Sequence, residues 1–345
     1  TWDLDYQGRL AVGRHDLLWG LSHRSSRDDA LATTLQLSFS PVRFTQRTTG
    51  VFLQDDLTLV PQTLQLGLGG RWDDSNLGGA TVAANGTLMW TPTRADTVWL
   101  RYARAPRMPS RAEQHVSVIA SVVPNDPLPV ALVSSAAGQT LKPERMTGVD
   151  LGYRTLLAAR LSLDATVYRY RYRDRVSGSL GTLDTTAYYP YALLQHVDLC
   201  NCSSGTVSGL ELAADWLAAP NWRLQASYTL TRVRMDDTDN AIAQANGLDV
   251  EAATPRYYGS LRSQWNLPQH RQVDAWLRGS AGFDRLSTPY PYRQRVPGYV
   301  TLDLRYSQPL RPGVEVAVIG RNLIGARRTE FISDYVASVP VEIER

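Results

Sequence analysis

Apolar and polar residues alternate with a period of two along most of the chain. In the segment 221–231, Trp222 and Leu224 fall on one side of an extended backbone, and Arg223 and Gln225 fall on the other. The same alternation recurs in four further segments: 64–71, 161–168, 299–306 and 314–321. A period of two that persists over so many residues predicts β-strands rather than helices.

The predicted strands are about 10–15 residues long, whereas strands of soluble proteins usually have about five or six residues. The greater length is what a tilted strand needs to cross a bilayer. The pattern predicts about fourteen full strands: 1–8, 14–25, 46–60, 62–75, 85–93, 96–105, 142–157, 160–175, 204–218, 221–236, 252–267, 270–285, 296–308 and 313–324.

The links between these strands alternate in length. The short links are 8–13, 61, 93–95, 157–159, 219–220, 268–269 and 309–312, and the long ones are 26–45, 76–84, 106–141, 176–203, 237–251, 286–295 and 325–335. Outer-membrane β-barrels sort their links in this way, with tight turns in the periplasm and long loops at the cell surface. A sandwich with Greek-key connections has no reason to do so. The sequence therefore predicts an all-β fold, an antiparallel up-and-down transmembrane β-barrel.

The direction of the strands suggests that this barrel is incomplete. A barrel with an even number of strands begins and ends in the periplasm, yet strand 1–8 is followed by a short turn, so at least one strand is expected to precede it. At the other end, the run VPVEIER (339–345) resembles the start of a last strand. We therefore expect free edges, which are prone to aggregation unless they are paired.

The composition restricts the class of protein without deciding it. A hydrophobic content of 43% and a mean hydropathy of −0.26 suit a soluble protein or a membrane barrel, because only every second residue of a barrel strand faces lipid. The net charge of +3 gives no reason to propose a nucleic-acid partner. Seventeen Tyr and nine Trp against five Phe suit positions between apolar and aqueous surroundings.

Five segments, in order along the chain, resemble the barrel of TonB-dependent outer-membrane receptors. They are GVFLQDDLTLVPQTLQLGLGGRWD (50–73), VWLRYARAPRMPSRAEQ (98–114), LKPERMTGVDLGYR (141–154), GLELAADW with WRLQASYTLT (209–216 and 222–231), and VPGYVTLDLRYSQPLRPGVEVAVIGRNLIGARRTEF (296–331). In the third, Asp150 stands where the family usually has Glu. The resemblance extends over nearly the whole chain, so residues 1–345 are interpreted as one partial barrel domain.

The resemblance implies a receptor in the bacterial outer membrane that takes up a scarce, bulky ligand, most often a ferric siderophore. It implies outer-membrane lipid, an N-terminal plug domain and TonB as partners; the plug and the TonB-contacting segment have no counterpart in 1–345. Large plugged transporters have 22 strands, so 335–345 would belong to strand 22 and the first strand here would be strand 8. Cobalamin, haem and carbohydrate remain alternative ligands, and no cofactor is implied.

Charged residues on the polar sides of the predicted strands are candidates for contact with the plug. They are Arg71, Arg101, Asp164, Arg223, Arg278, Asp303, Arg305, Glu315 and Arg321. Barrel interiors are wet, so simple hydration of these charges is the alternative interpretation.

The long loops carry the candidate ligand-binding residues. Loop 106–141 offers Arg107, Arg111, Glu113 and His115, and loop 176–203 offers Tyr188, Tyr189, Tyr191 and His196. Arginine binds anionic chelates through paired hydrogen bonds. The tyrosines fit an aromatic recognition surface or, alternatively, the girdle at the membrane interface. Neither histidine has a second His or Cys at metal-binding spacing, so no metal site is predicted.

The two cysteines, Cys200 and Cys202, lie in the run LCNC. In a surface loop exposed to an oxidising compartment, a disulfide is favoured. A redox or metal-binding pair is the alternative.

Enzyme motifs are absent from the sequence: there is no G-x-S-x-G, no P-loop and no H-E-x-x-H. Each of these arrangements carries a specific chemistry, so the chain is predicted not to be an enzyme. A passive channel or porin is the second hypothesis, because such a protein needs no plug and no energy source.

Overall fold

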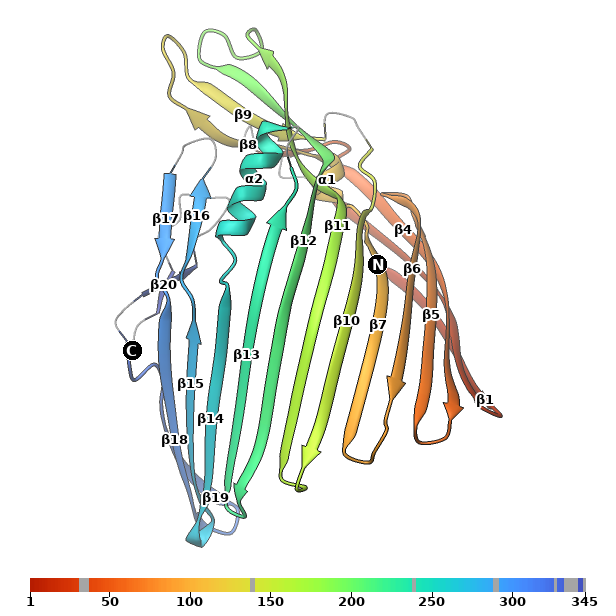
Figure 1. Ribbon diagram of the computed structural model, residues 1–345. Helices are drawn as coiled ribbons and strands as arrows, with labels where there is room; N and C mark the ends of the chain where they lie inside the picture. Colours follow the sequence, from red (N-terminus) through yellow and green to blue (C-terminus); the bar gives the residue numbers. More distant parts are fainter. Residues whose placement is uncertain are drawn as a thin grey trace.

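The structure is a computed structural model that describes residues 1–30, 37–136, 140–237, 240–287, 292–325, 328–331 and 341–343. Its main body is one curved antiparallel sheet of long strands that follow each other up and down (Figure 1). These fourteen strands are β1 (Trp2–Val12), β2 (His15–Asp29), β4 (Arg43–Val60), β5 (Leu64–Ser75), β6 (Gly79–Trp90), β7 (Asp96–Arg107), β10 (Glu144–Leu157), β11 (Leu161–Asp184), β12 (Leu193–Ala219), β13 (Trp222–Met235), β14 (Tyr257–Leu267), β15 (Arg271–Ser280), β18 (Tyr299–Arg311) and β19 (Val314–Gly320).

Each long strand pairs with the next one along the chain. The registers run without interruption from β1 through β7, pass from β7 to β10, and continue through β15, β18 and β19. In the described part of the chain, β1 is in register only with β2 and β19 only with β18, so the sheet is not closed into a barrel. The all-β, antiparallel, up-and-down fold with fourteen full strands, predicted from the alternation, is confirmed.

The alternation gives the sheet two chemically different faces. Arg101 is in register with Asp150, and this row lies on what we call the polar face. The neighbouring row, with Leu100, Leu151 and Val167, lies on the apolar face, and these three side chains are 48%, 49% and 48% exposed. A soluble protein rarely exposes so large an apolar surface, whereas a lipid-facing surface requires one.

The two ends of the sheet differ. One end, the turn end, consists of tight turns between consecutive strands, whereas the other, the loop end, carries the long connections (Figure 1). Gly13 and Gly313 have φ angles of +61° and +80° in turns of the turn end, a conformation that glycine adopts without steric cost. The structure also contains a 3-10 turn, η1 (Pro268–His270), at this end. None of the described helices is long and apolar enough to cross a membrane.

One predicted long link at the loop end is wrong. The segment 76–84 was expected to be a loop, but β6 begins at Gly79, so only a tight turn joins β5 to β6. The side chain of Asn76 bonds to the backbone of Thr45 and Arg47, and Leu77 is buried. The run of small residues that starts β6 has little polar–apolar contrast, which hid the strand.

The other long links contain more regular structure than the sequence indicated. The link 106–141 holds α1 (Arg111–His115), β8 (Val116–Val123) and β9 (Val130–Ser135), and the link after β13 holds α2 (Ala241–Ala252). The hairpin of β11 and β12 extends far beyond the predicted strand ends. Three short strands complete this end: β3 (Leu37–Phe39), β16 (Phe283–Ser287) and β17 (Tyr292–Val296).

These elements combine into what we call the loop-end assembly, formed by β3, β8, β9 and the outer halves of β11 and β12. Figure 1 labels β8 and β9 at this end of the sheet. Strand β9 pairs in parallel with the first residues of β12, and β3 pairs with β8. Ala131, Val133 and Leu194 form a small buried cluster against which Ile119 packs. The long loops are thus fixed to one another rather than independent.

The chain end departs from the prediction of a last barrel strand. Within VPVEIER, β21 (Val341–Ile343) pairs with β20 (Arg328–Phe331) in a separate two-stranded sheet. It does not continue the main sheet beside β19. The other residues of this run, and all of 332–338, lie outside the described residues.

Candidate functional site

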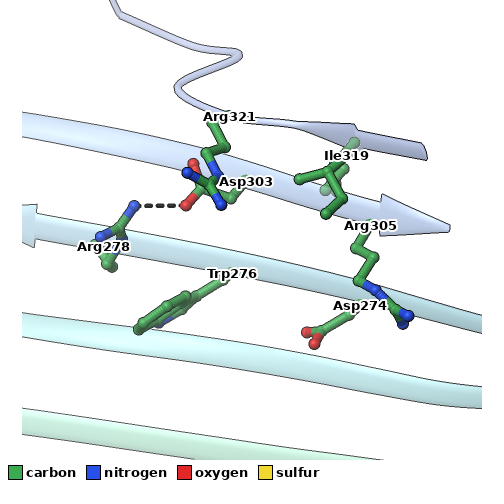
Figure 2. A pocket seen from close by; sticks show the side chains of 8 residues that line it. Asp274, Trp276, Arg278, Asp303, Arg305, Ile319 and Arg321 are labelled. Atoms are coloured by element: carbon green, nitrogen blue, oxygen red, sulfur yellow. Dashed lines mark hydrogen bonds and ion pairs between the residues drawn. The ribbon is translucent and has the colours of Figure 1, made fainter. Parts of the chain in front are cut away.

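The polar face carries the charged residues that the alternation assigned to it. By register, Arg71, Arg101, Asp164, Arg223, Arg278, Asp303, Arg305 and Glu315 all lie on this face, and Arg321 follows β19 beside it (Figure 2). Their contact with a plug domain stays a prediction.

Most of these charges form ion pairs along or between strands. Arg278 lies 2.5 Å from Asp303, Arg305 lies 2.6 Å from Glu315, and Arg71 bonds to Asp73 at 2.7 Å. Two further pairs join Asp164 to Arg154 and Arg223 to Asp215. Because these pairs are partly exposed, each contributes only about 0–1 kcal/mol to stability, and the groups can exchange partners at little cost.

One hollow on the polar face lies over β15, β18 and β19 (Figure 2). It has a volume of about 340 Å³ and is lined by Asp274, Trp276, Arg278, Asp303, Leu304, Arg305, Ile319 and Arg321. The guanidinium of Arg278 stacks 4.5 Å from the ring centre of Trp276. The hollow therefore combines cationic, anionic and aromatic groups and suits a polar protein surface better than an apolar small molecule.

A row of tyrosines on the polar face of β11 was not predicted from the sequence. Tyr168 and Tyr170 stack with ring centres 5.0 Å apart, and Tyr172 follows on the same face. The Tyr170 hydroxyl donates to Asp150 at 2.5 Å, and the Tyr168 hydroxyl bonds to Thr231 at 2.9 Å. The run VYRYRYR (167–173) signals this row, because every second residue of a strand shares one face.

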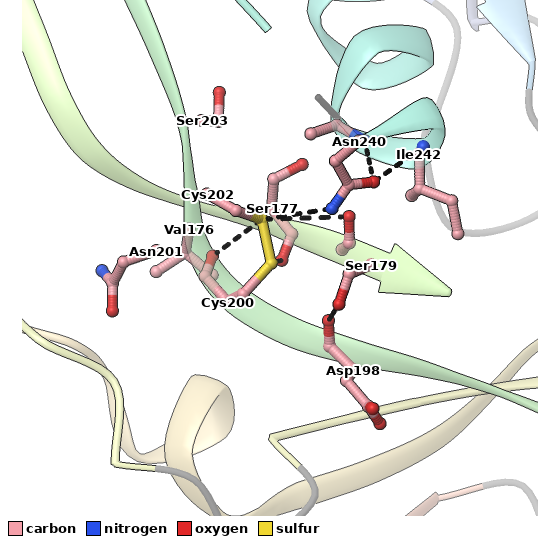
Figure 3. Close-up of a disulfide and its surroundings, with 12 residues drawn as sticks. Val176, Ser177, Ser179, Asp198, Cys200, Asn201, Cys202, Ser203, Asn240 and Ile242 are labelled. Carbon is pink, nitrogen blue, oxygen red and sulfur yellow. Dashed lines mark hydrogen bonds between the residues drawn. A yellow bond between two sulfur atoms is a disulfide. The ribbon is translucent and has the colours of Figure 1, made fainter. Parts of the chain in front are cut away.

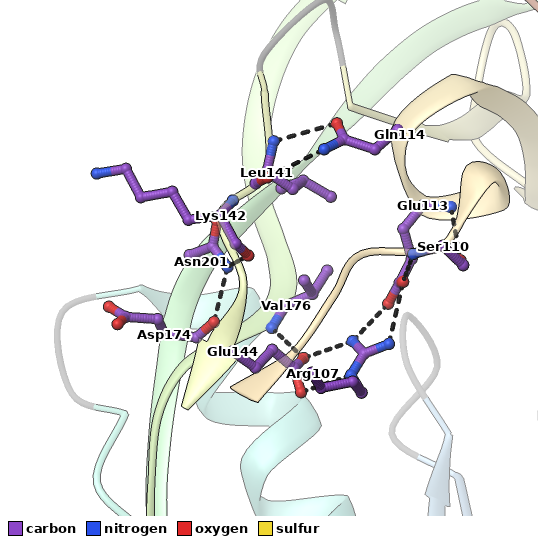
Figure 4. Close-up of polar contacts among 10 residues, drawn as sticks. All are labelled: Arg107, Ser110, Glu113, Gln114, Leu141, Lys142, Glu144, Asp174, Val176 and Asn201. Atoms are coloured by element: carbon purple, nitrogen blue, oxygen red, sulfur yellow. Dashed lines mark hydrogen bonds and ion pairs between the residues drawn. The ribbon is translucent and has the colours of Figure 1, made fainter. Parts of the chain in front are cut away.

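At the loop end, Arg107 joins three chain segments (Figure 4). It lies 2.7 Å from both Glu113 in α1 and Glu144 at the start of β10. Ser110 and Glu113 form a reciprocal cap at the start of α1, and Glu144 accepts from the backbone of Val176 at 2.8 Å. Burial disfavours the charged form of Glu113, but the bonds from Arg107 and Ser110 outweigh it, so the pKa of Glu113 is lowered.

Two amide side chains tie the base of the loop-end assembly together (Figure 4). Gln114 bonds to the backbone of Leu77 and to both the N–H and the carbonyl of Leu141. Asn201 bonds to both the N–H and the carbonyl of Lys142 and also donates to the carbonyl of Asp174. Backbone groups that a long loop would leave unpaired are thereby satisfied.

Arg111 is directed toward the end of β2 and the connection between β2 and β4 rather than toward an open surface. Its side chain is only 10% exposed and pairs with Asp28, and it donates to the carbonyls of Pro41 and Val42 at 2.8 Å. His115 packs beside it against Phe44, with ring centres 4.7 Å apart. Burial and the charge of Arg111 lower the pKa of His115. The structure thus gives Arg107, Arg111 and Glu113 bracing contacts, and their direct contact with a ligand stays a prediction.

The tyrosines of the second candidate loop are accessible. Tyr188, Tyr189 and Tyr191 are 39%, 69% and 80% exposed in the turn that joins β11 to β12. This turn is closed by a bond from the Tyr191 N–H to the Tyr188 carbonyl. His196 lies farther down β12, in register with Val133 of β9, and is separate from the tyrosine tip.

Cys200 and Cys202 are joined by a disulfide near the start of α2 (Figure 3). The Asn240 side chain lies 3.7 Å from the sulfur of Cys202 and also caps α2 by accepting from Ile242 and Ala243. The described residues contain no group of three His, Cys, Asp or Glu side chains that could hold a metal ion.

Known structures share this fold. The ferric enterobactin receptor of Pseudomonas aeruginosa in complex with enterobactin (PfeA, mutant Q482A) matches 94% of this chain and 48% of its own, with a TM-score of 0.75 and 18% identity. The siderophore receptor PirA of Acinetobacter baumannii matches 94% of this chain and 50% of its own, with a TM-score of 0.72 and 14% identity. The ferric-catecholate import receptor Fiu of Escherichia coli matches 95% of this chain and 50% of its own, with a TM-score of 0.65 and 13% identity.

The chain therefore spans about half the length of these receptors. A search of curated protein sequences finds no match. The family model described as "TonB dependent receptor-like, beta-barrel" matches residues 1–323, which is nearly the whole sheet. The chain belongs to the TonB-dependent receptor-like β-barrel family.

Proposed function

We propose that the chain is the barrel part of an outer-membrane receptor for the TonB-energised uptake of a ferric siderophore. The observation that carries this proposal is a family-typical sheet with one apolar face, one charged face and a braced loop-end assembly. Membership of the family implies an outer-membrane location. The loop end then lies at the cell surface and the turn end in the periplasm.

In this proposal, the ligand first meets the loop-end assembly. The exposed rings of Tyr188, Tyr189 and Tyr191 offer flat surfaces on which an aromatic chelate can stack. The stretch 169–184 of β11 separates them from the apolar face, which favours recognition over a place in the membrane girdle. The tyrosine row from Tyr168 to Tyr172 continues an aromatic path down the polar face.

The charged polar face is proposed to hold the plug domain of the full-length protein. The ion pairs on this face are partly exposed and exchangeable, and Arg101 makes no ion pair within the described part of the chain. A plug carboxylate facing Arg101 would be paired without breaking an existing contact. Energy from TonB, transmitted through the plug, would then release the ligand into the barrel.

A binding measurement on the full-length receptor tests the ligand site. The probe is ferric enterobactin, the iron complex of the ligand bound by one relative, followed by quenching of tryptophan fluorescence. Replacing Tyr188, Tyr189 and Tyr191 together by Ser removes three stacking rings and is expected to weaken binding about tenfold or more. The matched control is the double variant Leu180→Ser/Leu183→Ser, which alters exposed side chains of the same hairpin.

Equal affinity of the tyrosine variant and the control would show that the tip does not recognise the ligand. Solute-permeability measurements distinguish the second hypothesis: free passage of small sugars through the full-length protein in liposomes would identify a passive channel.

A further inference from the structure

Arginines interrupt the apolar face just where it approaches the loop end of β11 and β13. Arg169 and Arg232 lie in one row with Ser208 of β12 between them, and Arg171 and Arg234 lie in the next row with Thr206 between them. All four arginines are exposed. By strand geometry, the two rows are about 7 Å apart and the two arginine-bearing strands about 10 Å apart, so four guanidinium groups surround a patch with hydroxyl groups at its centre.

These four arginines, which we call the arginine quartet, line a surface hollow of about 490 Å³ together with Thr206, Ser208 and Asp236. In the described part of the chain, no member of the quartet is part of an ion pair or a side-chain hydrogen bond. Asp236 is the one carboxylate that lines the hollow. The hollow therefore holds four positive charges against one negative charge.

The choice of arginine carries no information, because 35 of the 36 basic residues of this chain are arginines. The position does. The next row toward the turn end holds Val167, Leu210 and Leu230, so the positive charge begins directly above the apolar face. This is the height at which headgroups meet a transmembrane barrel.

An apolar hollow lies below the quartet on the same strands. It has a volume of about 420 Å³, and its lining includes the small residues Ala165, Ala214 and Ala226, with Tyr153 and Tyr228 on either side. Arg169 is four residues from Ala165, a distance of about 13 Å along the strand. A cationic hollow and an apolar hollow are thus stacked in the order of the two parts of a lipid.

We propose that the quartet and the hollow below it bind one lipid whose headgroup carries more than one phosphate. The phosphates would lie between the arginines, which form paired, charge-assisted hydrogen bonds with such groups, and an acyl chain would occupy the alanine-lined hollow. The inference rests on the proposed outer-membrane orientation, in which the loop end faces the outer leaflet. It is independent of the siderophore site, which lies on the loop-end assembly and the opposite face of the sheet.

The test is titration of the purified full-length receptor in detergent with bis-phosphorylated lipid A, followed by native mass spectrometry. The double variant Arg169→Gln/Arg232→Gln removes one row of the quartet and is expected to weaken lipid binding about tenfold. The control, Arg94→Gln/Arg160→Gln, removes two exposed charges at the turn end and is expected to bind as the wild type does. Monophosphorylated lipid A is expected to bind more weakly to the wild type than the bis-phosphorylated form.

Two outcomes would overturn the proposal: equal lipid binding by the quartet variant and the control, or displacement of the lipid by inorganic phosphate at an equal concentration, which would indicate a general anion site. A second variant, Ala214→Phe, fills the apolar hollow and leaves the quartet unchanged. Undiminished lipid binding by this variant would also contradict the proposal. Ferric enterobactin binding, measured on the same samples, tests the proposed receptor function, and the melting temperature of each variant reports folding, so failure of one proposal is distinguishable from failure of the other.

Discussion

Replacing Arg107 by Met is expected to release α1 and the start of β10 from each other. The methionine keeps much of the side-chain length but leaves Glu113 and Glu144 facing each other without a cation. Both carboxylates are largely shielded, with 24% and 16% of their side chains exposed, whereas Arg107 itself is 50% exposed. The free energy of each lost contact is therefore expected to lie between that of a shielded ion pair and that of an exposed one.

Charge-assisted hydrogen bonds contribute about 1.5–3 kcal/mol when shielded, and exposed ion pairs contribute about 0.2–1 kcal/mol. With about 1 kcal/mol for each of the two pairs, opening of the segment 108–123 becomes about 2 kcal/mol more favourable, or about 30-fold more frequent. Hydrogen–deuterium exchange read by mass spectrometry measures this opening directly on peptides from 108–123.

The matched control is Arg145→Met. Arg145 neighbours Glu144 in sequence but faces the other side of the sheet, where its only ion pair in the described part of the chain is with Asp174 at 3.6 Å. Its loss is expected to change exchange in 108–123 less than about twofold. If Arg107→Met and Arg145→Met gave the same exchange rates, the assignment of Arg107 as the brace of this loop would be refuted.

Three further predictions concern the same structure. Because the pKa of Glu113 is lowered in the folded state from 4.5, its contribution to stability is complete above pH 4.5 and is lost as the pH falls through the lowered value; exchange of 108–123 should rise over that range, and a constant rate down to pH 3 would contradict this. Gly209→Val should lower the melting temperature, since a Cβ there would overlap the Leu230 carbonyl oxygen and overpacking costs about 1–3 kcal/mol. Gly86→Val, with its nearest contact at 3.5 Å, is the control, and equal melting temperatures would count against the packing argument. The variant Cys200→Ser/Cys202→Ser should lose less than about 2 kcal/mol of unfolding free energy, because a disulfide between residues two apart in sequence constrains the unfolded chain little. A larger loss in denaturant titrations would show that the disulfide holds α2 in place.

The strands of the main sheet were predictable because their chemistry is local. A lipid-facing side chain and a lumen-facing side chain alternate along each strand, and the contrast between them is visible in the sequence. Prediction fails where the polar–apolar contrast is weak or interrupted. The small residues at the start of β6 hid the beginning of that strand. The extension of β11 passes through register shifts between Tyr172 and Leu183, which interrupt the alternation. The hairpin of β8 and β9 carries apolar residues on both sides, so no polar–apolar alternation marks it in the sequence.

The site was less predictable because it depends on contacts between distant segments. Arg107 and Arg111 were predicted to bind a ligand, but their partners Glu144 and Asp28 lie in β10 and β2, and nothing near the two arginines in the sequence indicates the pairing. Arg169, Arg171 and the tyrosine row could have been predicted from VYRYRYR, since strand geometry separates alternate residues onto opposite faces. The second half of the quartet, in β13, required the register.

The central proposal, energised uptake of a ferric siderophore, is tested most directly by transport of radioactive ferric enterobactin into cells that carry the full-length receptor as their only route for this complex. The account predicts accumulation that requires TonB and an energised inner membrane and that falls when Tyr188, Tyr189 and Tyr191 are replaced together by Ser. Accumulation that continues unchanged without TonB would contradict the account and identify the protein as a passive pore.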